Sequence, residues 1–114
     1  MKVIYKIATA AQWRAAEAAG HFDGAPVDIA DGFIHFSDSG TVRETAARHF
    51  AGQEGLVLAA VDAERLGDAL KWEVSRGGAL FPHLYAALPL EAVLWTRPLP
   101  LDGEDHHLFP AELP

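Results

Sequence analysis

The sequence contains no cysteine, and this absence excludes disulfide bonds, thiolate metal sites and cysteine nucleophiles. It also has no apolar run near the roughly 20 residues that a transmembrane helix needs. The first residues, Met1–Tyr5, lack the long apolar region and the small-residue cleavage site of a signal peptide. We therefore expect a soluble, cytoplasmic protein with no membrane partner.

Basic residues are scarce: nine Lys and Arg stand against sixteen Asp and Glu, which gives a net charge of −7 at pH 7. Proteins that bind nucleic acid draw most of their affinity from cations that neutralise phosphates. The arginines here are scattered and form no basic cluster. We therefore expect no nucleic-acid partner, and the sequence leaves the oligomeric state open.

What is present is the composition of an ordinary globular domain. The chain has 114 residues, of which 50% are hydrophobic and 22% charged. This length allows a hydrophobic core without covalent staples. We expect residues 1–114 to form a single domain, with a tail over 98–114, rich in Pro, Asp and Glu, that wraps the surface or frays.

Hydrophobic periodicity and capping signals predict the main elements. Strands are expected at 2–7, 33–36, 56–61, 70–75 and 92–97, with a loop over 21–30. The segment 81–85 contains Pro82, which cannot donate to a ladder, so it is expected to be an edge strand, the start of a strand or an extended loop. The continuously apolar run 56–61 is typical of a central strand that is buried on both faces. Two main helices are expected, each opened by a capping box, Thr9 with Gln12 and Thr41 with Glu44. The predicted core residues are Trp13, Val57, Leu58, Val61, Trp72 and Val74.

The segment Asp28–Ser37 is the most informative stretch of the chain. Asp31-Gly32 is a turn signal, because glycine accepts positive φ without a Cβ clash. In the short strand that follows, Phe33, His35 and Ser37 share one face because side chains alternate. A histidine in such a strand is either a buried residue satisfied by the backbone or part of a small-molecule site.

Two later segments also carry polar groups beside aromatic rings. Glu73 follows Trp72 on the polar face of a strand, while Phe81, His83 and Tyr85 share one face of a segment that contains Pro82. General acid–base chemistry or nucleotide binding would use such a combination of histidines, a carboxylate and aromatics. We predict that His35, Ser37, His83 and Tyr85 line one pocket.

These three segments together resemble a known family. The motifs Asp31-Gly-Phe-Ile-His35-Phe-Ser37, Lys71-Trp72-Glu73 and Phe81-Pro-His83-Leu-Tyr85 are similar to those of a small bacterial family catalogued as domain of unknown function 952. The resemblance runs from about Val3 to Leu99, and Ala86 stands where that family commonly has a glycine. It implies an α+β, ADP-ribosyltransferase-like fold: a split mixed sheet with helices, whose cleft binds NAD in the enzymes of that type.

A second, weaker likeness concerns the NAD-dependent RNA 2′-phosphotransferases. Phe33-Ile-His35-Phe-Ser37, a helix, and then Leu56-Val-Leu with Val61-Asp-Ala resemble the C-terminal half of those enzymes. Their phosphate-gripping arginines have no clear counterparts here. We therefore carry over the cleft but not the reaction.

Three functions remain open at this point. The first is an enzyme of ADP-ribosyl or glycosyl transfer acting on NAD; the resemblance then implies that His35 holds the ribose, Tyr85 or Phe36 stacks on nicotinamide, and Glu73 is the catalytic carboxylate. The second is a non-catalytic module that binds a nucleotide-like ligand through Ser37, Phe36, His83 and Tyr85. The third is a metal-dependent hydrolase using His35, His83 and Glu73, although no local motif such as His-Glu-x-x-His supports it.

Overall fold

The computed structural model describes residues 1–114, the side chain of Arg76 excepted. The helices are α1 (Ala10–Ala19), α2 (Pro26–Asp31) and α3 (Val42–His49), with 3₁₀ turns η1 (Ala63–Ala69), η2 (Arg76–Gly78) and η3 (Leu90–Ala92). The strands are β1 (Val3–Thr9), β2 (His21–Phe22), β3 (Ile34–His35), β4 (Leu56–Asp62), β5 (Leu70–Val74), β6 (Leu80–Leu84), β7 (Leu88–Pro89) and β8 (Val93–Leu99). No helix in the described chain is both long and apolar enough to cross a bilayer.

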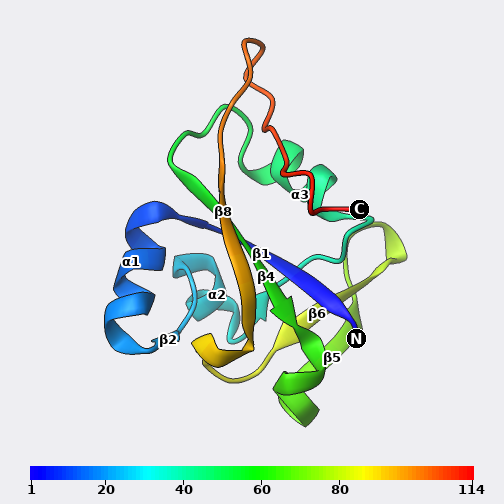
Figure 1. Cartoon of the computed structure of the whole chain (residues 1–114). Coiled ribbons are helices and arrows are strands. Elements are labelled where there is room, and N and C mark those ends of the chain that lie inside the picture. Colours follow the sequence, from blue (N-terminus) through cyan, green and yellow to red (C-terminus); the bar gives the residue numbers. More distant parts are fainter.

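The strands form two three-stranded sheets, in the orders β1-β4-β8 and β3-β6-β5, and a small ribbon of β2 with β7 (Figure 1). A bridge between Tyr5 and Ser37 links β1 to the segment that follows β3. The α+β class is therefore confirmed, and the sheet is split as expected. Every strand pairing in the described chain is antiparallel, so the expectation of a mixed sheet was wrong. Parallel neighbours need long crossover connections, which this short chain does not make.

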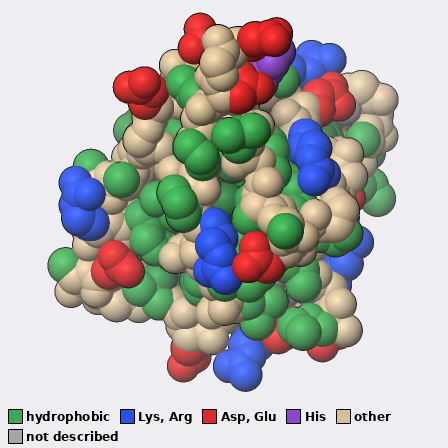
Figure 2. All heavy atoms as spheres, turned by 45° about the horizontal axis from the view of Figure 1, so that its top comes forward, with side chains coloured by type: hydrophobic (Ala, Val, Ile, Leu, Met, Phe, Trp, Pro, Cys, Tyr) green, Lys and Arg blue, Asp and Glu red, His purple; other side chains and the backbone are tan. Residues whose placement is uncertain are grey.

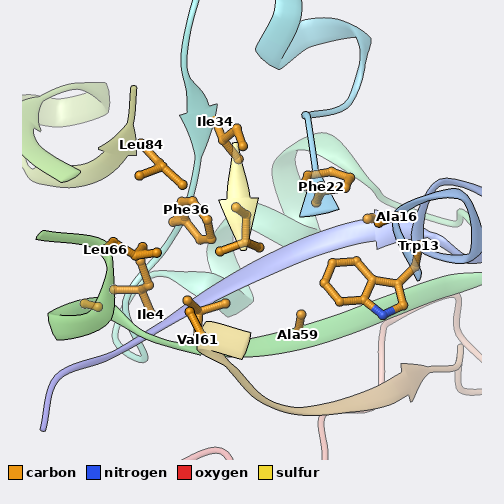
Figure 3. Packing of buried hydrophobic residues seen from close by; sticks show 14 residues of the cluster. Ile4, Trp13, Ala16, Phe22, Ile34, Phe36, Ala59, Val61, Leu66 and Leu84 are labelled. Carbon is orange, nitrogen blue, oxygen red and sulfur yellow. The ribbon is translucent and has the colours of Figure 1, made fainter. Parts of the chain in front are cut away.

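Strand β4 is the central strand of the larger sheet, as its apolar run predicts. Its alternate residues supply two separate clusters of the core: Ala59 and Val61 face one, while Leu58 and Ala60 face the other. The first cluster contains Trp13 from α1 packed near Phe22, together with residues of β1 and β6 (Figure 3). Both faces of β4 are therefore covered, which explains why the run shows no alternation.

Helix α1 begins as predicted, but α3 does not. Thr9 accepts from the Gln12 amide and the Gln12 side chain accepts from the Thr9 amide, which completes the capping box. Thr41 makes no such bond to Glu44. Its hydroxyl instead donates to Asp38 at 2.9 Å, and its own backbone is already helical, so the side chain cannot cap.

The predicted loop over 21–30 was wrong in two places, because it contains β2 and most of α2. Pro26 occupies the first turn of α2, where its fixed φ suits a helix and its missing N–H costs nothing. Asp28 accepts the backbone N–H of Ala25 at 2.7 Å, and Gly32 ends the helix at φ 85°. The Asp31-Gly32 turn is therefore the end of a short helix.

Two of the six predicted core residues are not buried. Trp13, Leu58 and Val61 are buried and Val57 packs against the core, but Trp72 is 37% exposed and Val74 70% exposed. Both lie on β5, which forms the edge of its sheet. Alternation along β5 identifies its two faces, but it does not show whether either face is covered by another layer.

The segment after β8 packs back onto the molecule. Leu113 is buried in the second cluster, Phe109 packs against that cluster, and Arg97 pairs with Glu112 at 2.9 Å. In the space-filling view of this side, Lys and Arg side chains lie singly among acidic and hydrophobic groups (Figure 2). The face in view therefore presents no continuous basic surface.

Candidate functional site

A cavity of about 700 Å³ lies where β1, the segment around β3, β6 and α3 meet. Aromatic rings line much of it, including Tyr5, Phe36, Phe50 and Phe81, and His35, Ser37 and His83 contribute polar atoms. A largely apolar cavity of this size with a few converging polar groups is typical of a small-molecule site. The question is how those polar groups are held.

Asp28 of α2 organises one side of the cavity. Its side chain is 1% exposed and accepts hydrogen bonds from the Lys6 ammonium, the backbone N–H groups of Ala25 and His35, and Nδ1 of His35. The Lys6 ammonium also donates to the carbonyl of His35 at 3.0 Å. We call Lys6, Asp28 and His35 the Asp28 cluster. Both buried charges are paired and hydrogen-bonded, as buried charges must be.

The charge state of the cluster follows from these contacts. Burial alone would raise the pKa of Asp28, but the hydrogen bonds from His35 and the charge of Lys6 outweigh it and hold the pKa well below the usual range. Burial lowers the pKa of Lys6, and the Asp28 carboxylate opposes this shift. Asp28 is therefore an ionised acceptor, and Nδ1 of His35 must carry the proton of their 2.6 Å bond.

The second ring nitrogen of His35 meets another carboxylate. Nε2 lies 2.9 Å from Oδ2 of Asp31, a half-exposed residue that also lines the cavity. Asp31 is the last residue of α2, and the chain turns at Gly32, so that His35, four residues after Asp31, lies beside it. Nε2 is therefore the atom of His35 that a ligand can reach. The ligand would displace the half-exposed Asp31 carboxylate and not the buried Asp28.

His83 of β6 is held by a different group of residues. Its Nδ1 lies 2.8 Å from Oε1 of Glu73 on the neighbouring strand β5, and the Tyr85 hydroxyl donates to the same oxygen at 2.6 Å. We call Glu73, His83 and Tyr85 the Glu73 cluster. The hydrogen bonds from Tyr85 and His83 lower the pKa of Glu73. The hydrogen bond between Tyr85 and Glu73 also raises the pKa of Tyr85. With Nδ1 engaged by Glu73, Nε2 is the nitrogen of His83 left for a ligand.

Phe33 brings the two clusters together. Its ring stacks on His83 at a centroid distance of 4.1 Å and also contacts His35 at 4.7 Å and Tyr85 at 5.2 Å. The two imidazole rings are 5.6 Å apart, edge to face. Residues His35 and His83 are also direct partners in the β3–β6 ladder, which fixes this proximity through the backbone.

The structure brings most of the predicted site residues together, although they do not all line the cavity. His35, Phe36, Ser37 and His83 line it, and the Ser37 hydroxyl lies 2.9 Å from the hydroxyl of Thr45 on α3. Tyr85 is not on the cavity wall. It is 47% exposed and reaches the site through Glu73.

Glu73 itself lies beside His83 and is not among the cavity-lining residues. Its side chain is 41% exposed. Among the described residues, no group of three or more His, Asp or Glu is arranged to hold a metal ion, and this includes the set of His35, His83 and Glu73.

Sequence reasoning missed Lys6, Asp28, Asp31 and Phe33 as site residues. One local signal was present for Lys6, which interrupts an otherwise apolar strand and is 6% exposed. The ion pair of Lys6 with Asp28 joins residues 22 positions apart and has no local signature. Asp28 and Asp31 were interpreted as turn residues, and Phe33 as part of the polar face only.

Comparison with known proteins gives one family and close structural relatives. A family model described as protein of unknown function (DUF952) matches residues 7–96. The crystal structure of protein CC0527 from Caulobacter crescentus is similar, with 53% identity over 93% of each chain and a TM-score of 0.90. The solution NMR structure of CC0527 gives 54% identity over 93% of this chain and 91% of that chain, with a TM-score of 0.83. No curated protein matches the chain.

Proposed function

Starting from the premise that this chain belongs to the family described as protein of unknown function (DUF952), we propose that it is an enzyme that binds a small, ring-bearing molecule in the cavity between His35 and His83. In this proposal the two histidines exchange protons with the ligand. The observation that carries it is the repeated arrangement of the two rings. Each histidine lines the cavity, and a carboxylate engages its Nδ1.

This arrangement suits general acid–base catalysis. A carboxylate that accepts from Nδ1–H fixes the tautomer and ring orientation, and it makes Nε2 the atom that gives or takes a proton. In this proposal one of the two histidines acts as the base and the other as the acid of a single reaction. Their separation of 5.6 Å between centroids places both within reach of one bound molecule.

The cavity lining bears on the ligand class. The aromatic side chains Tyr5, Phe36, Phe50 and Phe81 offer apolar contact to a flat ring. Lys6 is the single lysine in the described lining, and its ammonium is already bound by Asp28 and the His35 carbonyl. A diphosphate therefore finds no available lysine there, and we propose a nucleoside-sized or nicotinamide-riboside-sized ligand in preference to the whole of NAD.

Glu73 takes a supporting role in this proposal. The family resemblance implies that Glu73 is the catalytic carboxylate, but a group that stabilises charge on a ligand must face that ligand. Glu73 instead contacts Nδ1 of His83, so we propose it as a positioning residue. Asp31 lines the cavity beside His35 Nε2 and is the carboxylate better placed to support glycosyl transfer.

A thermal-shift screen tests the ligand half of the proposal. A ligand that binds only the folded state raises Tm by mass action. We expect stabilisation by nucleosides or nicotinamide riboside in the wild type and its loss in His35→Gln and His83→Gln. The matched control is His21→Gln, because His21 lies on β2 and does not line the cavity.

Turnover of each stabilising ligand, followed by chromatography of the products, then tests the catalytic half. Release of nicotinamide from NAD or nicotinamide riboside would assign glycosyl transfer. Binding without turnover would contradict catalysis and leave a non-catalytic binding module. The absence of stabilisation by every compound would contradict the cavity as the ligand site.

A further inference from the structure

The outer edge of β5 carries unpaired backbone groups and exposed apolar side chains. Strand β5 ends the order β3-β6-β5, and within the described chain no strand pairs with its other side. Trp72 is 37% exposed, Val74 70%, and Leu80, which is the ladder partner of Val74, 53%. An edge with these properties is a template for pairing with another strand.

The hydrogen-bond pattern shows which residues of β5 are available for pairing. The Ser75 N–H donates to Ala79, and the Tyr85 N–H donates to Ala69. Because hydrogen-bonded positions alternate in an antiparallel ladder, Lys71 and Glu73 direct their backbone groups toward β6. Residues 70, 72 and 74 direct theirs outward, and of these the Leu70 N–H is taken by Gly67. The outward amides and carbonyls of Trp72 and Val74 remain for a partner.

The side-chain order along β5 is complementary to itself. When two copies of Leu70–Val74 are aligned antiparallel with Trp72 opposite Trp72, Lys71 stands opposite Glu73 and Leu70 opposite Val74. In that register Trp72 is a hydrogen-bonded position, and Lys71 and Glu73 form the closer, non-hydrogen-bonded pairs. Among the described residues Lys71 makes no ion pair and acts on Glu73 of its own strand only through its charge, so its ammonium is available to a partner strand.

We propose that β5 pairs antiparallel with β5 of a second copy of this chain, centred on Trp72, to form a continuous six-stranded sheet. The pairing is supported by the self-complementary charges, the outward backbone groups and the exposed apolar side chains. It also extends the candidate site, because Lys71 of the second copy meets the carboxylate of Glu73, which holds His83. Pairing along one five-residue strand buries a small area, so the dimer is weak and concentration-dependent.

Charge-reversal variants test the register. Lys71→Glu and Glu73→Lys each replace two attractive pairs by two repulsive ones, and each raises the Kd of the dimer about tenfold in sedimentation equilibrium. Mixing the two variants restores association, because every cross-strand pair is then opposite in charge. Arg14→Glu on the exposed face of α1 makes the same change in net charge as Lys71→Glu and leaves the Kd unchanged.

A second measurement does not depend on how these variants fold. In amide hydrogen exchange of the wild type, protection of the Trp72 and Val74 amides increases with protein concentration, since these are the outward groups. A chain that stays monomeric up to about 1 mM overturns the proposal. Dimers in which these two amides stay unprotected, or in which the mixed variants fail to associate, overturn it as well. Pairing of the β5 edge with an added foreign peptide, but not with a second copy of this chain, would also overturn the proposal.

Discussion

The Asp28 cluster and the Glu73 cluster contain the same bond in different surroundings. Nδ1 of His35 lies 2.6 Å from Asp28, and Nδ1 of His83 lies 2.8 Å from Glu73. The side chain of Asp28 is 1% exposed and that of Glu73 is 41% exposed. Removing Asp28 would leave the buried Lys6 ammonium without a counter-charge, whereas water can take the place of the half-exposed Glu73 carboxylate. The first cluster therefore supports both fold and site, and the second mainly orients the site.

The largest expected effect comes from Asp28→Ala. Breaking a buried ion pair by removing one partner costs about 3–5 kcal/mol, because the remaining charge is uncompensated. We expect urea denaturation to show a loss of this size in the free energy of unfolding. The double variant Asp28→Asn/Lys6→Met should cost less than the sum of the single variants, since it leaves no buried charge. Additive single effects would contradict the pairing.

The second-largest expected effect is a loss of the stability that Asp28 contributes when the pH is lowered. The pKa of Asp28 is lowered in the folded state from about 3.9 when unfolded, so its contribution to stability is full above that value. The contribution declines as pH falls below about 3.9 toward the folded pKa. We expect the stability difference between wild type and Asp28→Asn to be largest at neutral pH and to shrink in acid. A difference that stays constant with pH would show that the charge of Asp28 does not matter.

Glu73→Gln should affect stability far less than Asp28→Ala. The pKa of Glu73 is lowered mainly by the hydrogen bonds from Tyr85 and His83, and the Glu73 side chain is 41% exposed, so water can solvate the group that replaces its carboxylate. We expect its urea midpoint to stay close to that of the wild type. Turnover of a ligand found by the thermal-shift screen should fall, because the acceptor on Nδ1 of His83 loses its negative charge. A large loss of stability here would contradict the contrast between the clusters.

The smallest expected effect is spectroscopic. The hydrogen bond to the Glu73 carboxylate raises the pKa of Tyr85, while burial raises that of Tyr5, the other tyrosine. In Glu73→Gln the pKa of Tyr85 should fall toward about 10, the ordinary value. An ultraviolet titration of tyrosinate should therefore show one of two transitions moving to lower pH. Identical curves in both proteins would place the Tyr85 hydroxyl away from Glu73.

Local signals in the sequence predicted the elements whose causes are local. The capping box at Thr9 and the apolar run of β4 are both confirmed. Strand β5 was predicted correctly, but the predicted burial of Trp72 was wrong, because whether another layer covers a sheet face depends on distant segments. Helix α2 was missed because it has six residues, too few to show periodicity.

The site residues show the same contrast between features with local causes and contacts that depend on distant segments. Alternation placed His35 and Ser37 on one face of a short strand, and both line the cavity. The contact of His83 with His35 depends on the register of β3 with β6, and the contact of Lys6 with Asp28 joins residues of β1 and α2 that are 22 positions apart. Neither contact can be predicted from a single segment of the sequence, so both were found only in the folded structure.

The most direct test of the account is a ligand titration followed by NMR of the histidine ring nitrogens in the ¹⁵N-labelled wild type. The probe is the compound that raises Tm most in the screen. We expect the Nε2 signals of His35 and His83 to shift together and to saturate at one ligand concentration, while those of His21 do not move. A stabilising ligand that leaves both of these Nε2 signals unchanged would contradict the claim that the two histidines face one ligand cavity.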